Sequence, residues 1–300
     1  MPPPVPAAEP PPPPLLPDGS DLAVDRASPA LSGYVLGYQG FRIGPTAQPR
    51  ARLVVPDGSV NVLFGFGAPV QVTDAVRPQL TLRAVSMVSP VALTAVLGRH
   101  TGGVHGLVAV LTPLGAYRLF GVPMNEWSGL YLDPAELLGR RLPHLRERLA
   151  ECADWTERFR LLDRLFAGQI LEGPECRREV AWAWAELQRS GGRVPIQRLA
   201  AATGWSRRHL ERRFREQVGR SPKDIAQIRR LQEALRLQEA GVPLAHLATR
   251  AGFHDQPHFT RAFKAMMGFS PLRLPADRLD WGPNALLKVL PEQAGPPAAG

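Results

Sequence analysis

In the last third of the chain, apolar residues recur at the three- and four-residue spacing of amphipathic helices, and the whole pattern occurs twice. Each copy has an apolar pair, a turn glycine, two apolar positions four residues apart and a Gly-x-Ser-Pro ending. The first copy consists of Leu199, Ala200, Gly204, Leu210, Phe214, Gly219, Ser221 and Pro222. The second copy consists of Leu247, Ala248, Gly252, Phe259, Phe263, Gly268, Ser270 and Pro271. The offset is 48 residues up to the turn glycine and 49 from the second helix onward. The repeat predicts two helix-turn-helix units, each of which presents a helix to the major groove of DNA.

Start signals place the helices around these two units. Ser206 is the expected N-cap of the first recognition helix, and Ser221-Pro222 followed by Asp224 is expected to begin a long helix over residues 222–239. Eighteen helical residues extend roughly 27 Å, comparable to the roughly 34 Å between successive major-groove faces of a duplex. One chain is therefore expected to reach two adjacent major-groove segments.

The region before the helices has a different pattern. Short β-type runs separated by Gly- and Pro-containing turns cover residues 34–38, 52–55, 60–66, 70–72, 80–88 and 104–111. Strands without intervening helices favour a β-sandwich or small barrel. Helical spacing then predicts a short helix at residues 114–120 and longer ones at 134–149 and 155–171.

These patterns predict an α+β multidomain protein in five stretches. They are a disordered Pro-rich tail (1–26), a β-rich sensor or dimerisation domain (27–130), a helical connector (131–174), a double helix-turn-helix domain (175–275) and a mostly flexible tail (276–300). Within the last stretch, residues 284–290 are expected to form one short helix.

Charge separates the same regions. The chain has 36 Lys+Arg and 27 Asp+Glu, a formal net charge of +9. Residues 176–273 alone contain 19 basic and 8 acidic side chains, so the excess positive charge lies in the repeated segment. Such a concentration is typical of a surface that binds a polyanion, and double-stranded DNA is the expected partner.

Helical spacing assigns the two faces of each recognition helix. In the first unit Leu210 and Phe214 share the packing face, which leaves charged residues on the other side. The candidate DNA-binding residues are Arg207, Arg208, Glu211, Arg212 and Arg215, and, in the second unit, Gln256, Pro257, His258, Thr260 and Arg261. Arginine can form paired hydrogen bonds with guanine, glutamine with adenine, and glutamate can accept from cytosine. An ordinary solvated surface is the alternative explanation for the charged stripe.

The residues "IQRLAAATGWSRRHLERRFREQVGRSPKDI" and "LAHLATRAGFHDQPHFTRAFKAMMGFSP" resemble the DNA-binding domain of AraC/XylS-family transcription regulators. The resemblance implies seven helices, two helix-turn-helix units, a rigid linking helix and, by default, transcriptional activation. It implies base contacts from Arg208, Glu211 and Arg212, and from Pro257, His258, Thr260 and Arg261. Pro257 stands where a polar side chain is often found, so it departs from the pattern.

The earlier words "VVPDGSVNVLFGFG" and "LTPLGAYRLFGVPMNEWSG" are similar to the sensor half of one branch of this family. That similarity implies a cupin-like domain that senses a small-molecule effector or forms a homodimer. It identifies no effector. RNA polymerase is a further expected partner of such a regulator.

Other chemistry is weighed against these expectations. His100 and His105 are the histidines of the β region and lack the companions of a cupin metal site, so no metal and no cofactor are expected. The alternative function is a DNA-binding domain fused to a cysteine-dependent alkyl-transfer repair enzyme, but Cys152 and Cys176 lie in no acceptor motif. Cys176 lies beside two arginines, which would lower a thiol pKa and suit a redox sensor, but the favoured interpretation is a partly buried helical cysteine with no special role. No catalytic residue, signal peptide or membrane span is predicted, and a cytoplasmic location is expected.

Overall fold

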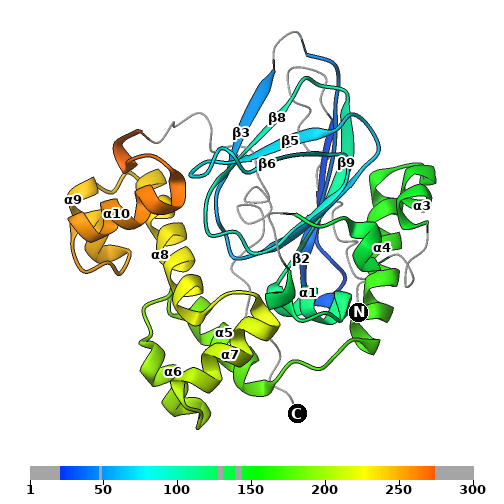
Figure 1. Cartoon of the computed structure of the whole chain (residues 1–300). Helices are drawn as coiled ribbons and strands as arrows, with labels where there is room; N and C mark the ends of the chain where they lie inside the picture. The colour runs from blue at the N-terminus through cyan, green and yellow to red at the C-terminus, as the bar shows by residue number, and fades with distance from the viewer. Residues whose placement is uncertain (1–20, 47–48, 128–130, 139–143, 274–300) are drawn as a thin grey trace, which may run out of the picture.

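The computed structural model describes residues 21–46, 49–127, 131–138 and 144–273. A β domain, made of the strands β1 to β9, lies beside a helical domain that contains the helices α5 to α10 (Figure 1). The expected α+β organisation is confirmed. The predicted helix at residues 284–290 lies outside the described residues, as does most of the predicted N-terminal tail.

Two antiparallel sheets build the β domain. The five-stranded sheet has the order β1-β2-β9-β4-β7, with bounds Asp21–Asp25, Val35–Ile43, Val104–Leu111, Val60–Gly65 and Met87–Ser89. The four-stranded sheet has the order β3-β8-β5-β6, with bounds Arg50–Val54, Val96–His100, Val70–Asp74 and Thr81–Ala84. Side chains alternate between the two faces of each strand, so one set faces the space between the sheets.

Three features of the sheets differ from the prediction. The run at residues 80–88 is not one strand but two, β6 and β7, which belong to different sheets. The chain turns between them at Val85, whose carbonyl packs so closely on Gly65 that a β-carbon there would clash. Strand β8 was not predicted, because Gly98, Arg99 and His100 interrupt its apolar run. Strand β1 lies inside the predicted tail of residues 1–26 and pairs with β2.

Helices cover the outer side of the five-stranded sheet (Figure 1). Helix α1 (Pro113–Phe120) follows β9, and α4 (Trp155–Glu172) packs on β2. A β-carbon at Gly40 would lie within 2.8 Å of three ring atoms of Trp155, so only glycine permits this approach. The indole N–H of Trp155 donates to Asp21 Oδ2 at 2.8 Å, and the Tyr38 hydroxyl donates to Asp163 Oδ1 at 2.8 Å.

The predicted helix at residues 134–149 is also divided. Helix α2 (Pro134–Leu138) begins after Asp133, whose Oδ1 accepts from the Ala135 backbone N–H at 2.8 Å. Helix α3 (Leu145–Glu151) begins after His144, whose φ of 55° is left-handed. A continuous right-handed helix cannot pass through that residue.

The helical domain contains six α-helices among the described residues. They are α5 (Arg178–Arg189), α6 (Ile196–Thr203), α7 (Arg207–Val218), α8 (Pro222–Glu239), α9 (Leu244–Arg250) and α10 (Gln256–Met267). A 3-10 turn at Pro271–Arg273 follows, so the seventh helix that the resemblance implies is not an α-helix within this range. Helix α8 begins with a full capping box, in which Ser221 and Asp224 each accept from the other's backbone N–H.

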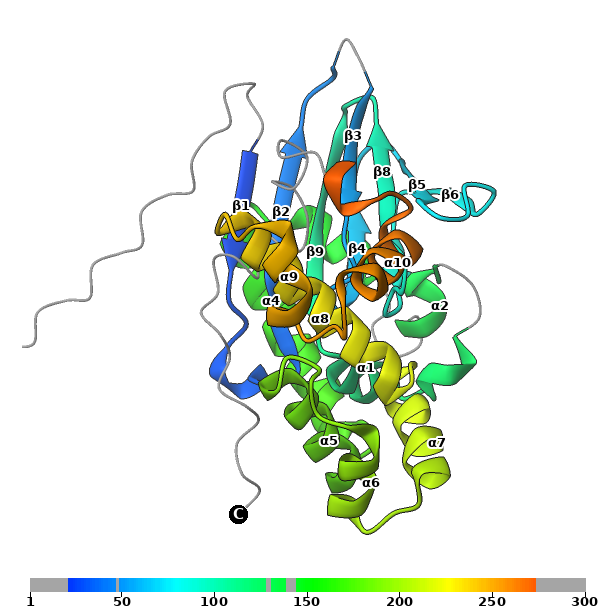
Figure 2. The same ribbon diagram turned by 90° about the vertical axis from the view of Figure 1, so that its left-hand side faces the viewer.

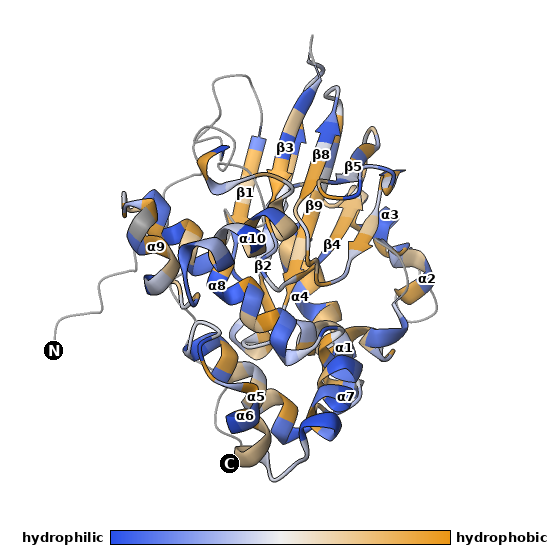
Figure 3. Cartoon of the chain, turned by 60° about the vertical axis from the view of Figure 1, so that its left-hand side comes forward, coloured by the Kyte–Doolittle hydropathy of each residue, from blue (hydrophilic) through white to orange (hydrophobic). Residues whose placement is uncertain are grey.

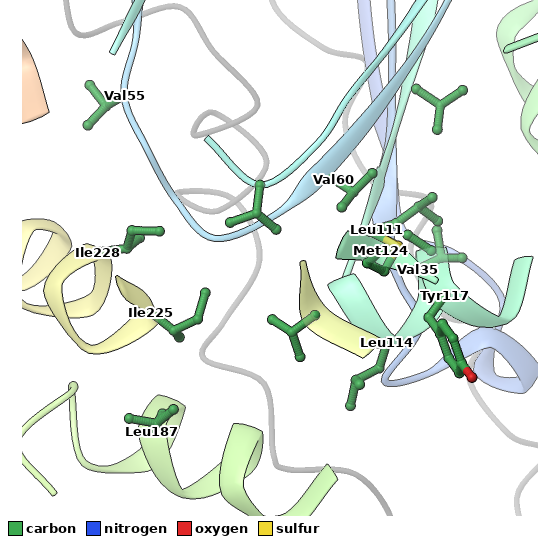
Figure 4. Close-up of a cluster of buried hydrophobic side chains, with 14 of the residues drawn as sticks. Val35, Val55, Val60, Leu111, Leu114, Tyr117, Met124, Leu187, Ile225 and Ile228 are labelled. Atoms are coloured by element: carbon green, nitrogen blue, oxygen red, sulfur yellow. The ribbon is translucent and has the colours of Figure 1, made fainter. Parts of the chain in front are cut away.

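The two domains share a continuous apolar core (Figure 4). Val55, which follows β3, belongs to the same buried cluster as Ile228 of α8, and Leu187 of α5 lies below Ile225. These four side chains are at most 2% exposed. Because separating the domains would return this surface to water, the helical domain is docked on the β domain rather than tethered to it.

Candidate nucleic-acid interface

Helix α7 has one buried and one exposed face. Ser206 Oγ accepts from the His209 backbone N–H at 3.2 Å and fixes the start of the helix. Leu210 and Phe214 are fully buried, whereas the other side of the helix is hydrophilic (Figure 3). The exposed residues are Arg207, Arg208, Arg212 and Arg215. The predicted division into a packing face and a charged face is therefore present.

Ion pairs distinguish the charged residues of α7 from one another. Glu211 Oε1 lies 3.0 Å from Arg207 Nε, and its Oε2 lies 3.9 Å from Arg215 Nη1. Arg208 and Arg212 have no ion-pair partner within the described part of the chain. Their guanidinium groups can therefore bind phosphate or a base edge without first breaking a contact, whereas Glu211 would have to exchange partners.

Helix α10 repeats this construction. Asp255 Oδ1 accepts from the His258 backbone N–H at 2.7 Å, and this hydrogen bond, followed by one from His254, lowers the pKa of the exposed Asp255. Pro257 lies in the first turn, where a missing N–H leaves no helical hydrogen bond unmade. Gln256, Pro257 and Arg261 are exposed, and His258 and Thr260 are half-buried.

The 49-residue offset relates the two reading faces position by position. His258 corresponds to His209, and each ring packs edge-on against the aromatic residue of the preceding turn, Phe253 or Trp205. Part of the His258 ring is therefore occupied in packing. The same offset relates Arg215 to Lys264, which is exposed on α10 and was absent from the predicted set. The 49-residue offset of the repeat, applied to Arg215, would have identified Lys264 as a candidate DNA-binding residue.

The two recognition helices lie near opposite ends of α8 (Figure 2). The C-terminal end of each one touches the β domain. At α7, a β-carbon on Gly219 would lie 3.3 Å from Met124 Cβ, and Arg220 Nε donates to the Val91 carbonyl at 2.7 Å. At α10, the Ala95 backbone N–H donates to the Met266 carbonyl at 2.6 Å. In the N-terminal halves, which contact bases in helix-turn-helix proteins, Arg207, Arg208, Gln256 and Pro257 are exposed.

Residues 90–95, between β7 and β8, make both of these backbone contacts, and we call them the bridging segment. Asp74 anchors the segment, because its Oδ2 accepts from Thr94 Oγ1 at 2.7 Å. One short stretch of the β domain therefore contacts both helix-turn-helix units.

The two histidines that were considered as metal ligands, His100 and His105, lie in different surroundings. His100 faces the space between the sheets, whereas the His105 ring packs between Phe66 and Trp155. The described residues contain no group of three His, Cys, Asp or Glu side chains that could hold a metal. The described helices include none that is both long enough and apolar enough to cross a bilayer.

The low-pKa thiol that was the alternative interpretation of Cys176 is contradicted. Burial raises the pKa of Cys176 to about 11, and the opposing charge of Arg118 is too weak to offset it. Burial, followed by the Glu157 charge, also raises the pKa of Cys152. Neither environment favours the thiolate that nucleophilic or redox chemistry needs.

Sequence comparisons identify relatives of the helical domain. A family described as a helix-turn-helix domain matches residues 199–275. The probable transcription factor PqrA of Proteus vulgaris is 34% identical over 93 residues, which cover 31% of this chain and 75% of that protein. The multiple antibiotic resistance protein MarA of Escherichia coli is 32% identical over 79 residues, or 26% of this chain and 62% of MarA. The transcriptional regulator MtrA of Neisseria gonorrhoeae is 39% identical over 77 residues, or 25% of this chain and 26% of MtrA.

A structural comparison covers both domains more loosely. ToxT of Vibrio cholerae aligns over 75% of this chain and 96% of its own, with a TM-score of 0.42 and 12% identity. A TM-score of 0.42 is too low to indicate a shared function.

Two helix-turn-helix units, joined by one long helix and exposing equivalent faces, define a DNA-binding protein of the double helix-turn-helix class. The sequence relatives identify the family within this class. The chain belongs to the AraC/XylS family of transcription regulators.

Proposed function

We propose that this regulator activates transcription by placing α7 and α10 in successive major-groove segments of one DNA duplex. Arg208 and Arg212 contact bases or phosphates in the first segment, and Gln256 and Arg261 do so in the second. Arg207, Arg215 and Lys264 contribute mainly through their charge. RNA polymerase is the proposed partner in activation, and the cytoplasm is the proposed location.

One observation carries the proposal: exposed cationic residues stand at equivalent positions on two helices that a single capped helix separates. Helix α8 has 18 residues, so it extends roughly 27 Å, against the roughly 34 Å repeat of a duplex. The core beneath α8 holds it in place, which favours a fixed spacing between the two reading faces over an adjustable one.

The β domain is proposed to sense a small-molecule effector or to form a homodimer. Its contacts with the C-terminal ends of both recognition helices support a regulatory role, because a change in the β domain can reach the DNA-reading units through them. An activity in alkyl transfer is not proposed, since the two thiols are held in environments that disfavour the thiolate.

The test is DNA binding by single-arginine variants. The region upstream of the chain's own coding sequence would be footprinted to locate an operator. Arg212→Ala and Arg261→Ala should each weaken operator binding by about 1–3 kcal/mol and relax specificity at one base pair. Arg160→Ala is the matched control, because Arg160 is an exposed helical arginine on α4, away from both reading faces.

Binding should also weaken steeply with salt, through release of counterions from the phosphates. Loss of one arginine should lower that slope by roughly one if it contacts a phosphate. If both variants bind the operator as tightly as Arg160→Ala does, α7 and α10 are not the reading helices.

A further inference from the structure

A cavity of about 580 Å³ lies between the two sheets of the β domain. This size falls within the roughly 300–1,000 Å³ that is usual for small-molecule sites. Inward-facing strand residues make most of its wall apolar, among them Phe41, Ile43, Leu63, Val72 and Val96. An apolar body therefore fits the walls.

Arg52 brings a positive charge to this apolar wall. It lies in the middle of β3, opposite Gly98 of β8, where the absent side chain leaves room for the guanidinium group. The side chain as a whole keeps some exposure, but Nε and Nη2 are shut off from solvent and have no hydrogen-bond partner among the described residues. Burial lowers the pKa of Arg52 to about 9, so the group remains charged at neutral pH.

An unpaired cation in such surroundings is costly unless something neutralises it. The acidic group on the cavity wall, Asp57, does not do so. Its Oδ1 accepts from the Ser59 hydroxyl at 2.6 Å and from the Ser59 backbone N–H at 2.8 Å, and the charge that acts on it is that of Arg229. No acidic side chain acts on Arg52 among the described residues.

His100 adds a neutral donor near Arg52. Its Nδ1 accepts from the Gly102 backbone N–H at 3.1 Å, which places the ring proton on Nε2. Burial, followed by the charges of Arg50 and Arg52, lowers the pKa of His100, so the ring is neutral at physiological pH. A neutral ring with an N–H and a charged guanidinium group suit one anionic group.

We propose that the cavity binds a small molecule that has an apolar body and a single anionic group, and that this group pairs with Arg52. The inference rests on the proposed function for its regulatory meaning, since it names the chemical class of the effector. The ligand binding itself can be tested without DNA.

The test compares two fluorescent probes of similar shape, of which one is an anion. They are 1-anilinonaphthalene-8-sulfonate and the uncharged N-phenyl-1-naphthylamine. Arg52→Met should weaken binding of the sulfonate about tenfold or more, because a hydrogen bond between charged groups is lost, and should leave the neutral probe within about twofold. Arg52→Lys should restore part of the loss. Arg42→Met, an exposed arginine on the outer face of β2, is the control and should change neither affinity.

A second measurement needs no variant and so does not depend on how Arg52→Met folds. On the unaltered protein, 4-phenylbutyrate should displace the neutral probe about tenfold more effectively than 4-phenylbutanol. Equal displacement by the acid and the alcohol would overturn the proposal. So would an equal loss of both probes in Arg52→Met, because Arg52 would then shape the cavity rather than pair with an anion. Either result leaves the operator test of Arg212 and Arg261 untouched, so the two failures are distinguishable.

Discussion

Docking of α10 on the β domain can be measured at Gly268. This glycine ends α10 with φ of 83°, and a β-carbon on it would lie 2.6 Å from the Ala75 carbonyl oxygen. Gly241, which follows α8, has a similar φ of 75° but nothing within 4 Å of the same position. Replacing each glycine with alanine therefore adds the same backbone strain, but only Gly268→Ala adds a clash between the domains.

The expected magnitudes follow from these two differences. A left-handed alanine costs roughly 1–2 kcal/mol, which is the whole effect expected for Gly241→Ala. At Gly268 the backbone on one side must also move, because a carbon cannot approach an oxygen to 2.6 Å. That movement breaks the hydrogen bond from Ala95 to Met266, and a buried group left without its partner costs about 1–3 kcal/mol. Gly268→Ala should therefore destabilise the protein by about 2–5 kcal/mol.

Urea unfolding of both variants gives the free energies, and amide hydrogen exchange locates the change. In Gly268→Ala the Ala95 amide should exchange faster than in the unaltered protein, whereas in Gly241→Ala its exchange should follow global stability alone. Equal destabilisation by the two substitutions, with Ala95 equally protected, would refute the docked arrangement.

Two single substitutions are expected to change the stability of the protein. Ser221→Ala removes the cap of α8 and should cost about 1–2 kcal/mol in thermal unfolding, with Lys223→Ala as a control on the same first turn. At Asp74, burial alone would raise the pKa, but hydrogen bonds from Thr94 and Arg77 outweigh it and hold the pKa below its usual value. The stability that Asp74 contributes is therefore complete above its unfolded pKa of about 3.9 and is lost as pH falls through the lower folded value. Asp74→Asn should accordingly destabilise the protein at pH 7. In urea unfolding, the difference in free energy between the variant and the unaltered protein should become smaller as the pH is lowered below about 3.9.

The helical domain could be predicted closely because local signals determine it. Turn glycines, serine and aspartate caps and four-residue apolar spacing each act within one or two helical turns. Ser206 and Ser221 cap the helices whose starts the pattern assigned to them. The identities of the DNA-contacting residues remain predictions.

The β domain was predicted less well because its boundaries depend on distant contacts. The turn between β6 and β7 lies where the Val85 carbonyl packs on Gly65 of β4. The local sequence around Val85 contains no signal for this contact with a distant strand. Likewise β1 is polar at both ends and becomes a strand through its pairing with β2. No feature of the sequence indicates that Arg52 is partly buried in a cavity, because an arginine in a short strand is ordinarily exposed.

The bridging segment is expected to couple the two helix-turn-helix units. Val91 accepts from Arg220 beside α7, and four residues later Ala95 donates to Met266 of α10. Pro90, Ala92, Leu93 and Thr94 of the same segment line the cavity between the sheets. A ligand that displaces the segment would therefore shift both contacts together. If the segment moves as one piece, Arg220→Ala should loosen the first contact and also speed amide exchange at Ala95, although the hydrogen-bond partner of that amide is Met266 and not Arg220.

Hydrogen exchange of Arg220→Ala against Arg160→Ala makes this coupling measurable, because both variants lose one positive charge and Arg160 lies on α4, away from the segment. Faster exchange at Ala95 only in Arg220→Ala, beyond the change in global stability, is the expected result. Unchanged exchange at Ala95 would mean that the two contacts are independent. The β domain would then act on each recognition helix separately, and the spacing between the reading faces would be set by α8 alone.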